Sequence, residues 1–247
     1  YFGLQKIGVI PIMALPTHRY LEVSQFVDIA QAKACFVPAK TRDYSFTDLV
    51  SRLLKEKKCL EMGIVLGQTD GNFLNLDELI TRKPRASQSD IDAIQIDPDD
   101  PAVFQLSGGT TGIPKLIPRT HNDYICNTRF ACASTETAQN KILLDILPIG
   151  HNLPLACPGM QGFLMKGGTV VFSQTTRGDT LFPLIEKHRV THIHCVPALL
   201  IRWIHDEKIN DFDLSSLEYI QSGGQRLQPE VRRRTYDLLP NVFVQEN

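Results

Sequence analysis

The sequence has no apolar run that approaches the roughly 20 residues a membrane-spanning helix needs. Its first residues, 1–6, lack the charged-then-apolar layout of a secretion signal and are typical of the middle of a structural element. A formal net charge of -1 gives no electrostatic reason to expect nucleic acid or an acidic membrane as a partner. These absences argue against a membrane protein and against a protein that binds nucleic acid.

Paired cysteine motifs are also missing, because none of the 6 cysteines forms a C-x-x-C pair. Irregular spacing in a chain of 247 residues does not suggest a disulfide framework, so we expect reduced thiols in a cytosolic protein. His192, His194 and Cys195 lie close in the sequence, but on a strand Cys195 points away from the two histidines. No zinc site is therefore predicted.

Short apolar segments alternate with amphipathic ones along most of the chain. Strands are expected at residues 7–14, 34–38, 62–67, 102–106, 141–148, 168–172, 190–196 and 217–222. Helices are expected at residues 21–32, 45–57, 122–137, 181–188 and 197–206. This alternation predicts an α/β fold with largely parallel sheets flanked by helices. A polar, turn-rich stretch at 81–101 predicts a boundary between two α/β subdomains, 1–100 and 101–247.

The most informative segment is residues 107–115, Ser-Gly-Gly-Thr-Thr-Gly-Ile-Pro-Lys, which follows a predicted strand. Its glycines allow the backbone to approach a ligand closely, and successive N–H groups can then form an anion-binding nest. The hydroxyl groups add short donors, and Lys115 adds a positive charge. Polyphosphate is the ligand that needs this combination.

Two known glycine-rich motifs do not match residues 107–115. A Walker A loop places Lys before Ser or Thr at the start of a helix, whereas Lys115 lies between Pro114 and Leu116. A dinucleotide fingerprint opens directly into a helix, which Pro114 and Pro118 prevent. A flexible surface linker is the remaining alternative, but a linker has no reason to lie between a buried strand and a Pro-Lys pair.

The segment from Ser107 to Lys115 is similar to the signature phosphate loop of adenylate-forming enzymes: acyl-CoA synthetases, luciferases and the adenylation domains of nonribosomal peptide synthesis. Residues 147–159 resemble a segment of the stand-alone aryl-acid–AMP ligases, which load 2,3-dihydroxybenzoate or salicylate onto carrier proteins in siderophore biosynthesis. Residues 221–227 resemble the family's third landmark, a strand end whose glycines lie against adenine. The landmarks occur in the family order, and the resemblance covers essentially the whole chain.

The resemblance implies roles for individual residues. ATP phosphates and the departing pyrophosphate would be held by Ser107, Gly108, Gly109, Thr110, Thr111, Gly112 and Lys115. Mg²⁺ would act as counterion, with no metal ligand assigned in this chain. The adenine pocket would be lined by Gly223, Gly224 and Gln225. His151 would stand between the acyl pocket and the phosphates as a catalytic gate, with Lys115 as the second catalytic residue.

The same resemblance assigns the acid-binding residues His151, Asn152, Cys157, Ser222 and Asn247. Asn152 would hydrogen-bond the ortho hydroxyl or the carboxylate of the aryl acid. Cys157 favours salicylate, because relatives that take 2,3-dihydroxybenzoate tend to carry Ser there; Cys is also a common core residue. Asn247 occupies a position where an apolar residue is usual, which suggests an unusual substrate or a disordered end.

The implied reaction converts an aryl acid and ATP into an aryl-adenylate and pyrophosphate, followed by transfer to the thiol of an aryl carrier protein. Two alternatives stay open: an adenylation domain or acyl-CoA ligase for another acid, and a nucleotide-binding module without chemistry. The chain stops before the expected Mg²⁺-binding Glu motif, the ribose-binding Asp and the small C-terminal domain. We therefore expect a fragment that cannot adenylate alone.

Overall fold

The computed structural model describes residues 1–41, 44–69, 71–108 and 114–246. By its internal contacts the chain divides into two units, Tyr1–Pro118 and Arg119–Asn247. The sequence placed the boundary earlier, between residues 100 and 101. The boundary drawn from the contacts lies later in the chain, after Pro118. The reason is that the strand after residue 100 is hydrogen-bonded to the N-terminal segment: Phe104 donates its N–H to the carbonyl of Pro11.

The first unit has a three-stranded sheet in the order β1-β4-β5 with parallel pairing, and two small two-stranded sheets, β2-β3 and β6-β7. Its strands are β1 (Ala34–Pro38), β2 (Lys40–Thr41), β3 (Tyr44–Ser45), β4 (Met62–Leu66), β5 (Leu74–Asn75), β6 (Pro101–Leu106) and β7 (Leu116–Thr120). Its helices are α1 (Phe2–Lys6), α2 (Tyr20–Ala30), α3 (Phe46–Glu56), α4 (Leu76–Thr81) and α5 (Gln88–Asp92).

Helix α3 shows why these residues fold as predicted. Ser45 caps the helix by accepting a hydrogen bond from the N–H of Asp48. The buried residues recur at helical spacing and form one face: Phe46, Leu49, Val50 and Leu53. That face packs closely on β4, where a Cβ at Gly63 would lie 2.7 Å from both Val50 and Phe73.

Two details of this unit differ from the sequence prediction. Residues 7–14 do not form a strand; only Ile12 makes an isolated bridge, to Phe104. The chain turns at Gly8, with φ +70°, and Pro11 has no N–H to donate to a strand ladder. In α2, helical spacing predicts that Leu21 and Ile29 share a buried face with Phe26, but these two side chains are 61% and 64% exposed.

The second unit is built on a five-stranded parallel sheet in the order β12-β11-β10-β8-β9. Its strands are β8 (Ile142–Asp145), β9 (Thr169–Phe172), β10 (His192–Cys195), β11 (Tyr219–Ser222) and β12 (Phe243–Glu246). Its helices are α6 (His121–Ser134), α7 (Asn152–Ala156), α8 (Gly159–Met165), α9 (Gly178–His188), α10 (Pro197–Ile204), the 3₁₀ helix η1 (Glu207–Asp211) and α11 (Pro229–Leu238).

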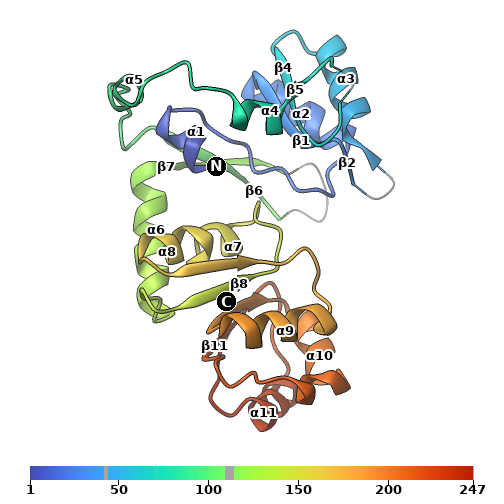
Figure 1. The fold of residues 1–247 in the computed structure, drawn as a ribbon, viewed down its shortest axis with the longest axis vertical. Coiled ribbons are helices and arrows are strands. Elements are labelled where there is room, and N and C mark those ends of the chain that lie inside the picture. Colours follow the sequence, from blue (N-terminus) through green and yellow to red (C-terminus); the bar gives the residue numbers. More distant parts are fainter. Residues whose placement is uncertain (42–43, 70, 109–113, 247) are drawn as a thin grey trace. The chain divides into compact units, whose positions relative to one another are not determined.

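The two faces of this sheet carry different helices. Helices α6, α7 and α8 lie together on one side, and α9, α10 and α11 lie on the other (Figure 1). Leu144, Ile193, Ile220 and Val244 from four neighbouring strands face the α9–α11 side and form the main core of the unit. The α/β fold with largely parallel sheets flanked by helices is confirmed.

Candidate functional site

In the first unit, two hydrogen bonds join the two ends of the predicted phosphate loop, Ser107 and Lys115. The N–H of Ser107 donates to the carbonyl of Lys115 at 3.1 Å, and the N–H of Lys115 donates to Ser107 Oγ at 2.9 Å. These reciprocal bonds join the end of β6 to the start of β7. The side chain of Lys115 is exposed, as is Gly108. Residues Gly109, Thr110, Thr111 and Gly112 lie outside the described residues, so their predicted roles remain predictions.

In the second unit the candidate residues follow the carboxyl ends of parallel strands. The chain passes from β8 to β9 on one side and then returns to β10 on the other side of β8, so the strand order reverses between β8 and β10. Open parallel sheets bind ligands at the carboxyl edge beside such a reversal. Residues 151–157 follow β8, and residues 223–225 follow β11. Asn247, which follows β12, lies outside the described residues.

His151 is the N-cap residue of α7 and Asn152 is its first residue. The His151 side chain is exposed, yet the surrounding protein partly desolvates the ring and lowers its pKa. The imidazole is therefore mainly neutral at pH 7. The side-chain oxygen of Asn152 is buried and has no hydrogen-bond partner in the part of the chain that the structure describes. Because a buried amide oxygen without a partner costs free energy, this atom is suited to accept a bond from a ligand.

Cys157 ends α7 and lies half-buried beside two polar groups. Burial raises the pKa of its thiol, while the charge of Arg119 and a hydrogen bond with Asn127 lower it. The net shift is upward, so the group is a neutral thiol at pH 7. It can offer only a weak hydrogen bond to a ligand.

The first glycine after β11, Gly223, lies near α7. Gly223 is buried, and a Cβ placed there would meet Leu153 Cδ2 at 3.2 Å. Gly224 is exposed and has φ +88°, a conformation that favours glycine. Ser222 is completely buried at the end of β11, and Gln225 is exposed. The first turn of α7 and the β11 glycines are thus brought together, although they lie about seventy residues apart in the chain.

Sequence reasoning missed a row of buried polar side chains on the α8 side of the same sheet. Asp145, His194 and Gln221 are each 2% exposed and end or nearly end β8, β10 and β11. Among the described residues, Nδ1 of His194 and Oε1 of Gln221 have no hydrogen-bond partner, and the Asp145 carboxyl is approached only by the backbone N–H of Leu147. The signal that could have found the row is an aspartate inside the apolar run 142–147, since a buried polar group requires a partner.

Desolvation determines the protonation states of Asp145 and His194. Burial raises the pKa of Asp145 to about 7, with a nearby backbone N–H of Leu147 offsetting only part of the effect. Burial lowers the pKa of His194 to about 3, so its imidazole is neutral at pH 7. His192, two residues earlier on the same face, differs because both ring nitrogens have partners: Thr191 Oγ1 and the carbonyl of Thr135, each at 2.9 Å.

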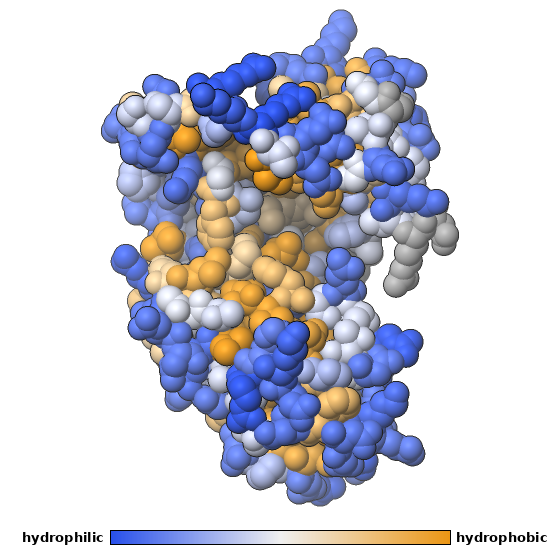
Figure 2. Space-filling model, viewed as in Figure 1, coloured by the Kyte–Doolittle hydropathy of each residue, from blue (hydrophilic) through white to orange (hydrophobic). Residues whose placement is uncertain are grey.

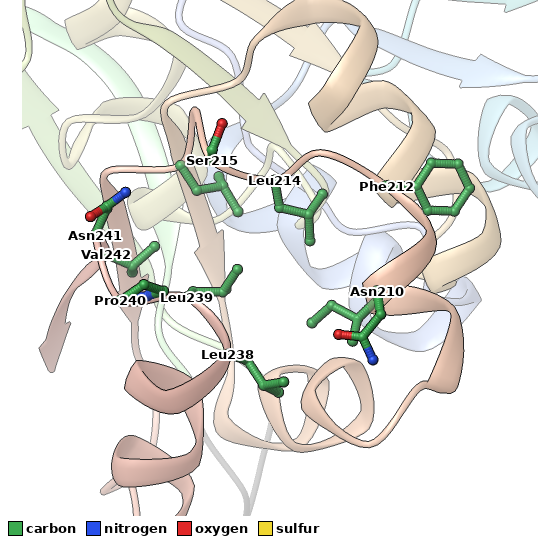
Figure 3. A pocket seen from close by; sticks show the side chains of 11 residues that line it. Asn210, Phe212, Leu214, Ser215, Leu238, Leu239, Pro240, Asn241 and Val242 are labelled. Carbon is green, nitrogen blue, oxygen red and sulfur yellow. The ribbon is translucent and has the colours of Figure 1, made fainter.

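A cavity of about 290 Å³ lies at the opposite end of this unit (Figure 3). It is lined by residues that precede β11 and β12: Ile209, Asn210, Phe212, Leu214, Ser215, Leu217, Leu238, Leu239, Pro240, Asn241 and Val242. None of these side chains titrates, and the cavity lies near the amino ends of the strands. It therefore has no part in the candidate site.

In the described part of the chain, neither the exposed apolar residues nor the potential metal ligands indicate a second site. Phe130 and Ile80 are 74% and 72% exposed, and hydrophobic residues are visible on the face shown in Figure 2; exposed apolar residues of this kind are common in proteins. Among residues 1–41, 44–69, 71–108 and 114–246, no three His, Cys, Asp or Glu side chains are grouped to hold a metal ion. Within the same ranges no helix is both long and apolar enough to cross a membrane. All six cysteines are free.

Comparison with known proteins identifies the relatives of this chain. A family profile described as AMP-binding enzyme matches residues 1–246. The vibriobactin-specific 2,3-dihydroxybenzoate-AMP ligase of Vibrio cholerae is 39% identical over 237 residues, which cover 95% of this chain and 42% of that protein. The salicyl-AMP ligase / salicyl-S-ArCP synthetase of Mycobacterium tuberculosis is 36% identical over 233 residues, which cover 94% of this chain and 40% of that protein.

Solved structures agree with these relatives. The apo structure of Mycobacterium smegmatis MbtA superposes with a TM-score of 0.85 at 33% identity, covering 98% of this chain and 43% of that chain. The anthranilate CoA ligase AuaEII, solved with anthranoyl-AMP, also gives a TM-score of 0.85, over 98% of this chain and 46% of that chain, but at 19% identity it supports the fold alone. The chain spans about 42% of the length of the Vibrio relative.

Proposed function

Because the chain belongs to the AMP-binding enzyme family, we propose that the protein carrying it adenylates an aromatic carboxylic acid with ATP. The acyl group then passes to a carrier-protein thiol, which forms a thioester and releases AMP. The observation that carries the proposal is the buried, unpartnered oxygen of Asn152, one residue after His151 at the start of α7. Relatives at 36% to 39% identity are named as ligases for 2,3-dihydroxybenzoate and salicylate, two aromatic acids with a phenolic donor.

The proposed chemistry is an in-line displacement at phosphorus. A carboxylate oxygen of the acid forms a bond to the α-phosphorus of ATP, and the bond from that phosphorus to the β-bridging oxygen breaks to release pyrophosphate. The carboxylate needs no proton removed, so the protein must mainly position the reactants and stabilise negative charge. Ser107 and Lys115, which are joined by hydrogen bonds, would contribute a hydroxyl group and a positive charge to this task.

Mg²⁺ would supply charge neutralisation on the phosphates when bound. We assign no residue of this chain as a magnesium ligand.

His151 would donate a hydrogen bond to a carboxylate or α-phosphate oxygen. A neutral imidazole carries one N–H and can donate without first losing a proton. Its lowered pKa keeps it in that form at neutral pH. The role is therefore positioning and stabilisation of oxygen atoms rather than transfer of a proton.

For the acid itself we propose salicylate or 2,3-dihydroxybenzoate. The unpartnered oxygen of Asn152 can accept a hydrogen bond from a phenolic hydroxyl. Cys157, held as a neutral thiol, offers little to a second ring hydroxyl and favours salicylate of the two. An aryl carrier protein is the proposed acceptor of the acyl group.

The proposal predicts acid-dependent ATP–pyrophosphate exchange by the protein that carries this chain. We expect exchange with salicylate and 2,3-dihydroxybenzoate, and weaker exchange with benzoate and amino acids. Lys115→Ala and His151→Ala should each lower the exchange rate about tenfold to a hundredfold, because each removes a donor to developing or transferred charge. Lys166→Ala and His205→Ala are matched controls at exposed positions outside the candidate site and should retain the wild-type rate.

Nucleotide binding without exchange under any acid would contradict the proposed reaction and favour a binding module. Exchange that responds only to amino acids or fatty acids would instead favour another acid substrate. The acceptor is tested separately, by comparing carrier protein with coenzyme A, since a relative from Streptomyces is named as a salicylyl-CoA synthase.

Gly223→Ala tests the proposed adenine contact. The new methyl group would press only on the flexible end of Leu153, and Gly223 has no positive φ, so we expect a stability loss below about 1 kcal/mol. The methyl group would, however, occupy space proposed for the adenine ring, and the KM for ATP should rise about tenfold or more. Gly224→Ala is the comparison variant, since its cost should come from backbone strain at φ +88° and lower Tm instead. An unchanged KM for ATP in Gly223→Ala would place the nucleotide elsewhere.

A further inference from the structure

A carboxylate that the proposed reaction does not use holds the turn that follows β11, residues 223–227. The N–H of Gly223 donates to the carbonyl of Cys195 on β10 at 3.1 Å, which holds the start of the turn. The N–H of Leu227 donates to Oε2 of Glu246 on β12 at 3.2 Å, which holds its end. The turn is therefore joined at each end to a different strand of the sheet.

Strand register brings Glu246 to the turn. Ser222, the last residue of β11, pairs with Glu246, the last residue of β12, in the parallel ladder. The chain leaves β11 at Gly223 and returns to the end of β12 at Leu227. The N–H that Glu246 binds belongs to the peptide group between Arg226 and Leu227. The bond therefore fixes the orientation of this peptide group as well as its position.

Arg232 of α11 holds the carboxylate in place. Its guanidinium donates through Nη2 to Oε1 of Glu246 and through Nη1 to the carbonyl of Val244 at 3.1 Å. Because the guanidinium is planar and its donors have fixed directions, two bonds to β12 leave the Glu246 side chain little freedom. The guanidinium, together with the Leu227 N–H, lowers the pKa of Glu246, so the carboxyl is ionised at pH 7.

The same pair contributes little to the stability of the fold. The side chains of Arg232 and Glu246 are 33% and 31% exposed, and ion pairs with such access to solvent add little to the free energy of unfolding. Leu227 is anchored independently, because its side chain is 2% exposed and belongs to the main core of the unit. We therefore expect loss of the pair to alter the backbone of the turn more than the stability of the unit.

We propose that Glu246, held by Arg232, is a positioning residue for nucleotide binding, which sets the backbone of residues 223–227 so that an adenine ring fits against it. The inference rests on the proposed function, in which this turn lines the adenine pocket. Glu246 acts through the peptide group at Leu227 and does not touch the nucleotide. A misplacement of about 1 Å can cost about a hundredfold in rate. A loosened turn should therefore bind adenine nucleotides more weakly and distinguish ATP from GTP less well.

The test uses the whole protein that carries this chain. It measures the KM for ATP and for GTP in acid-dependent pyrophosphate exchange, and the Kd of AMP by calorimetry. Glu246→Ala should raise the KM for ATP and the Kd of AMP about tenfold, lower the preference for ATP over GTP about threefold or more, and change kcat less than about threefold. Glu246→Gln keeps an acceptor for the Leu227 N–H and should restore most of the affinity.

Arg232→Ala tests the link between the two side chains. It leaves Glu246 bonded to Leu227 but free to turn, so its effect on the KM for ATP should be smaller than that of Glu246→Ala. In the double variant the loss of binding free energy should be less than the sum of the two single losses, because the residues act as one unit.

Asp213→Ala is the matched control. Asp213 also accepts from a backbone N–H, that of Ser215 at 2.9 Å, and pairs with an arginine, Arg189, at 2.6 Å. It precedes β11 and lies at the end of the sheet away from the turn. Asp213→Ala should match Glu246→Ala in Tm, yet leave the KM for ATP, the Kd of AMP and the nucleotide preference unchanged.

Three outcomes would contradict these proposals in different ways. If KM, Kd and nucleotide preference all stay within twofold of wild type in folded Glu246→Ala, the positioning role is wrong and the proposed adenylation stands. Equal losses of nucleotide affinity in Glu246→Ala and Asp213→Ala would also overturn the positioning role, since the effect would then follow from stability. Absence of acid-dependent exchange in the wild-type protein would overturn the proposed reaction, while the AMP titrations would still decide the positioning role.

Discussion

We expect Gly159→Ala to lower the free energy of unfolding by about 3 kcal/mol or more. Gly159 has φ +50°, where a residue with a Cβ is strained by about 1–2 kcal/mol. The new Cβ would also lie 2.2 Å from the carbonyl oxygen of Pro154 and 2.8 Å from that of Leu153. These atoms belong to the backbone of α7 and cannot rotate away as a side chain can, so overpacking adds about 1–3 kcal/mol.

The measurement is urea unfolding or thermal denaturation, where a loss of this size should lower Tm by about 6–12 °C in a chain of this length. Gly3→Ala is the matched control, since a Cβ at that helical position meets nothing within 4 Å. It should be neutral or slightly stabilising, because alanine favours a helix more than glycine does. A Tm for Gly159→Ala within 2 °C of wild type would mean that α7 moves easily relative to Gly159.

We expect Asp145→Asn to stabilise the protein at pH 8 and to lose this advantage at low pH. The pKa of Asp145 is raised from 3.8 to about 7 in the folded protein, so folding favours its protonated form. Its contribution to stability is complete below pH 3.8 and is lost as the pH rises through 7. Above that range the wild-type protein must bury a carboxylate that the Leu147 N–H stabilises only in part, at a cost on the order of 2–4 kcal/mol. Asparagine carries no charge at any pH and avoids that cost.

Urea unfolding of both proteins at pH 5, 6, 7 and 8 checks this prediction through the difference in unfolding free energy. His194 has the opposite pH dependence, because its lowered pKa makes the folded state lose stability as the pH falls below 6.5. That effect is common to both proteins and cancels in the difference. A difference that stays constant from pH 5 to 8 would show that Asp145 is not desolvated as the structure indicates.

Local sequence patterns predicted much of the fold because several elements are specified by their own residues. Helix α3 has both its cap, Ser45, and a regular apolar face. Strand β4 was predicted from a short apolar run bounded by glycine, and it forms within one residue of the expected range. Helices α7 and α8 were not predicted, since prolines at 154 and 158 interrupt the pattern that identifies a helix.

The candidate site was predictable only where a motif marks it. Residues 107–115, His151 and Gly223 carry distinctive residue types, whereas Asp145 and His194 looked like ordinary members of apolar strands. Asp145 and His194 come together only because of the strand order: β10 lies directly beside β8, and β9 lies on the other side of β8. That information is tertiary, and no single-sequence pattern contains it. The assigned roles of the site residues stay predictions until the exchange measurements are made.

The contact between Leu153 and Gly223 has a thermodynamic consequence. A ligand that pushes the backbone at Gly223 toward α7 would press on the Leu153 side chain, and Leu153 follows His151 and Asn152 in the first turn of that helix. Two ligands that share such an element influence each other's affinity by the same factor in both directions. We therefore expect energetic coupling between a ligand bound at the turn of Gly223 and Gly224 and a ligand bound at the start of α7. Each ligand should bind with a different affinity when the other is present.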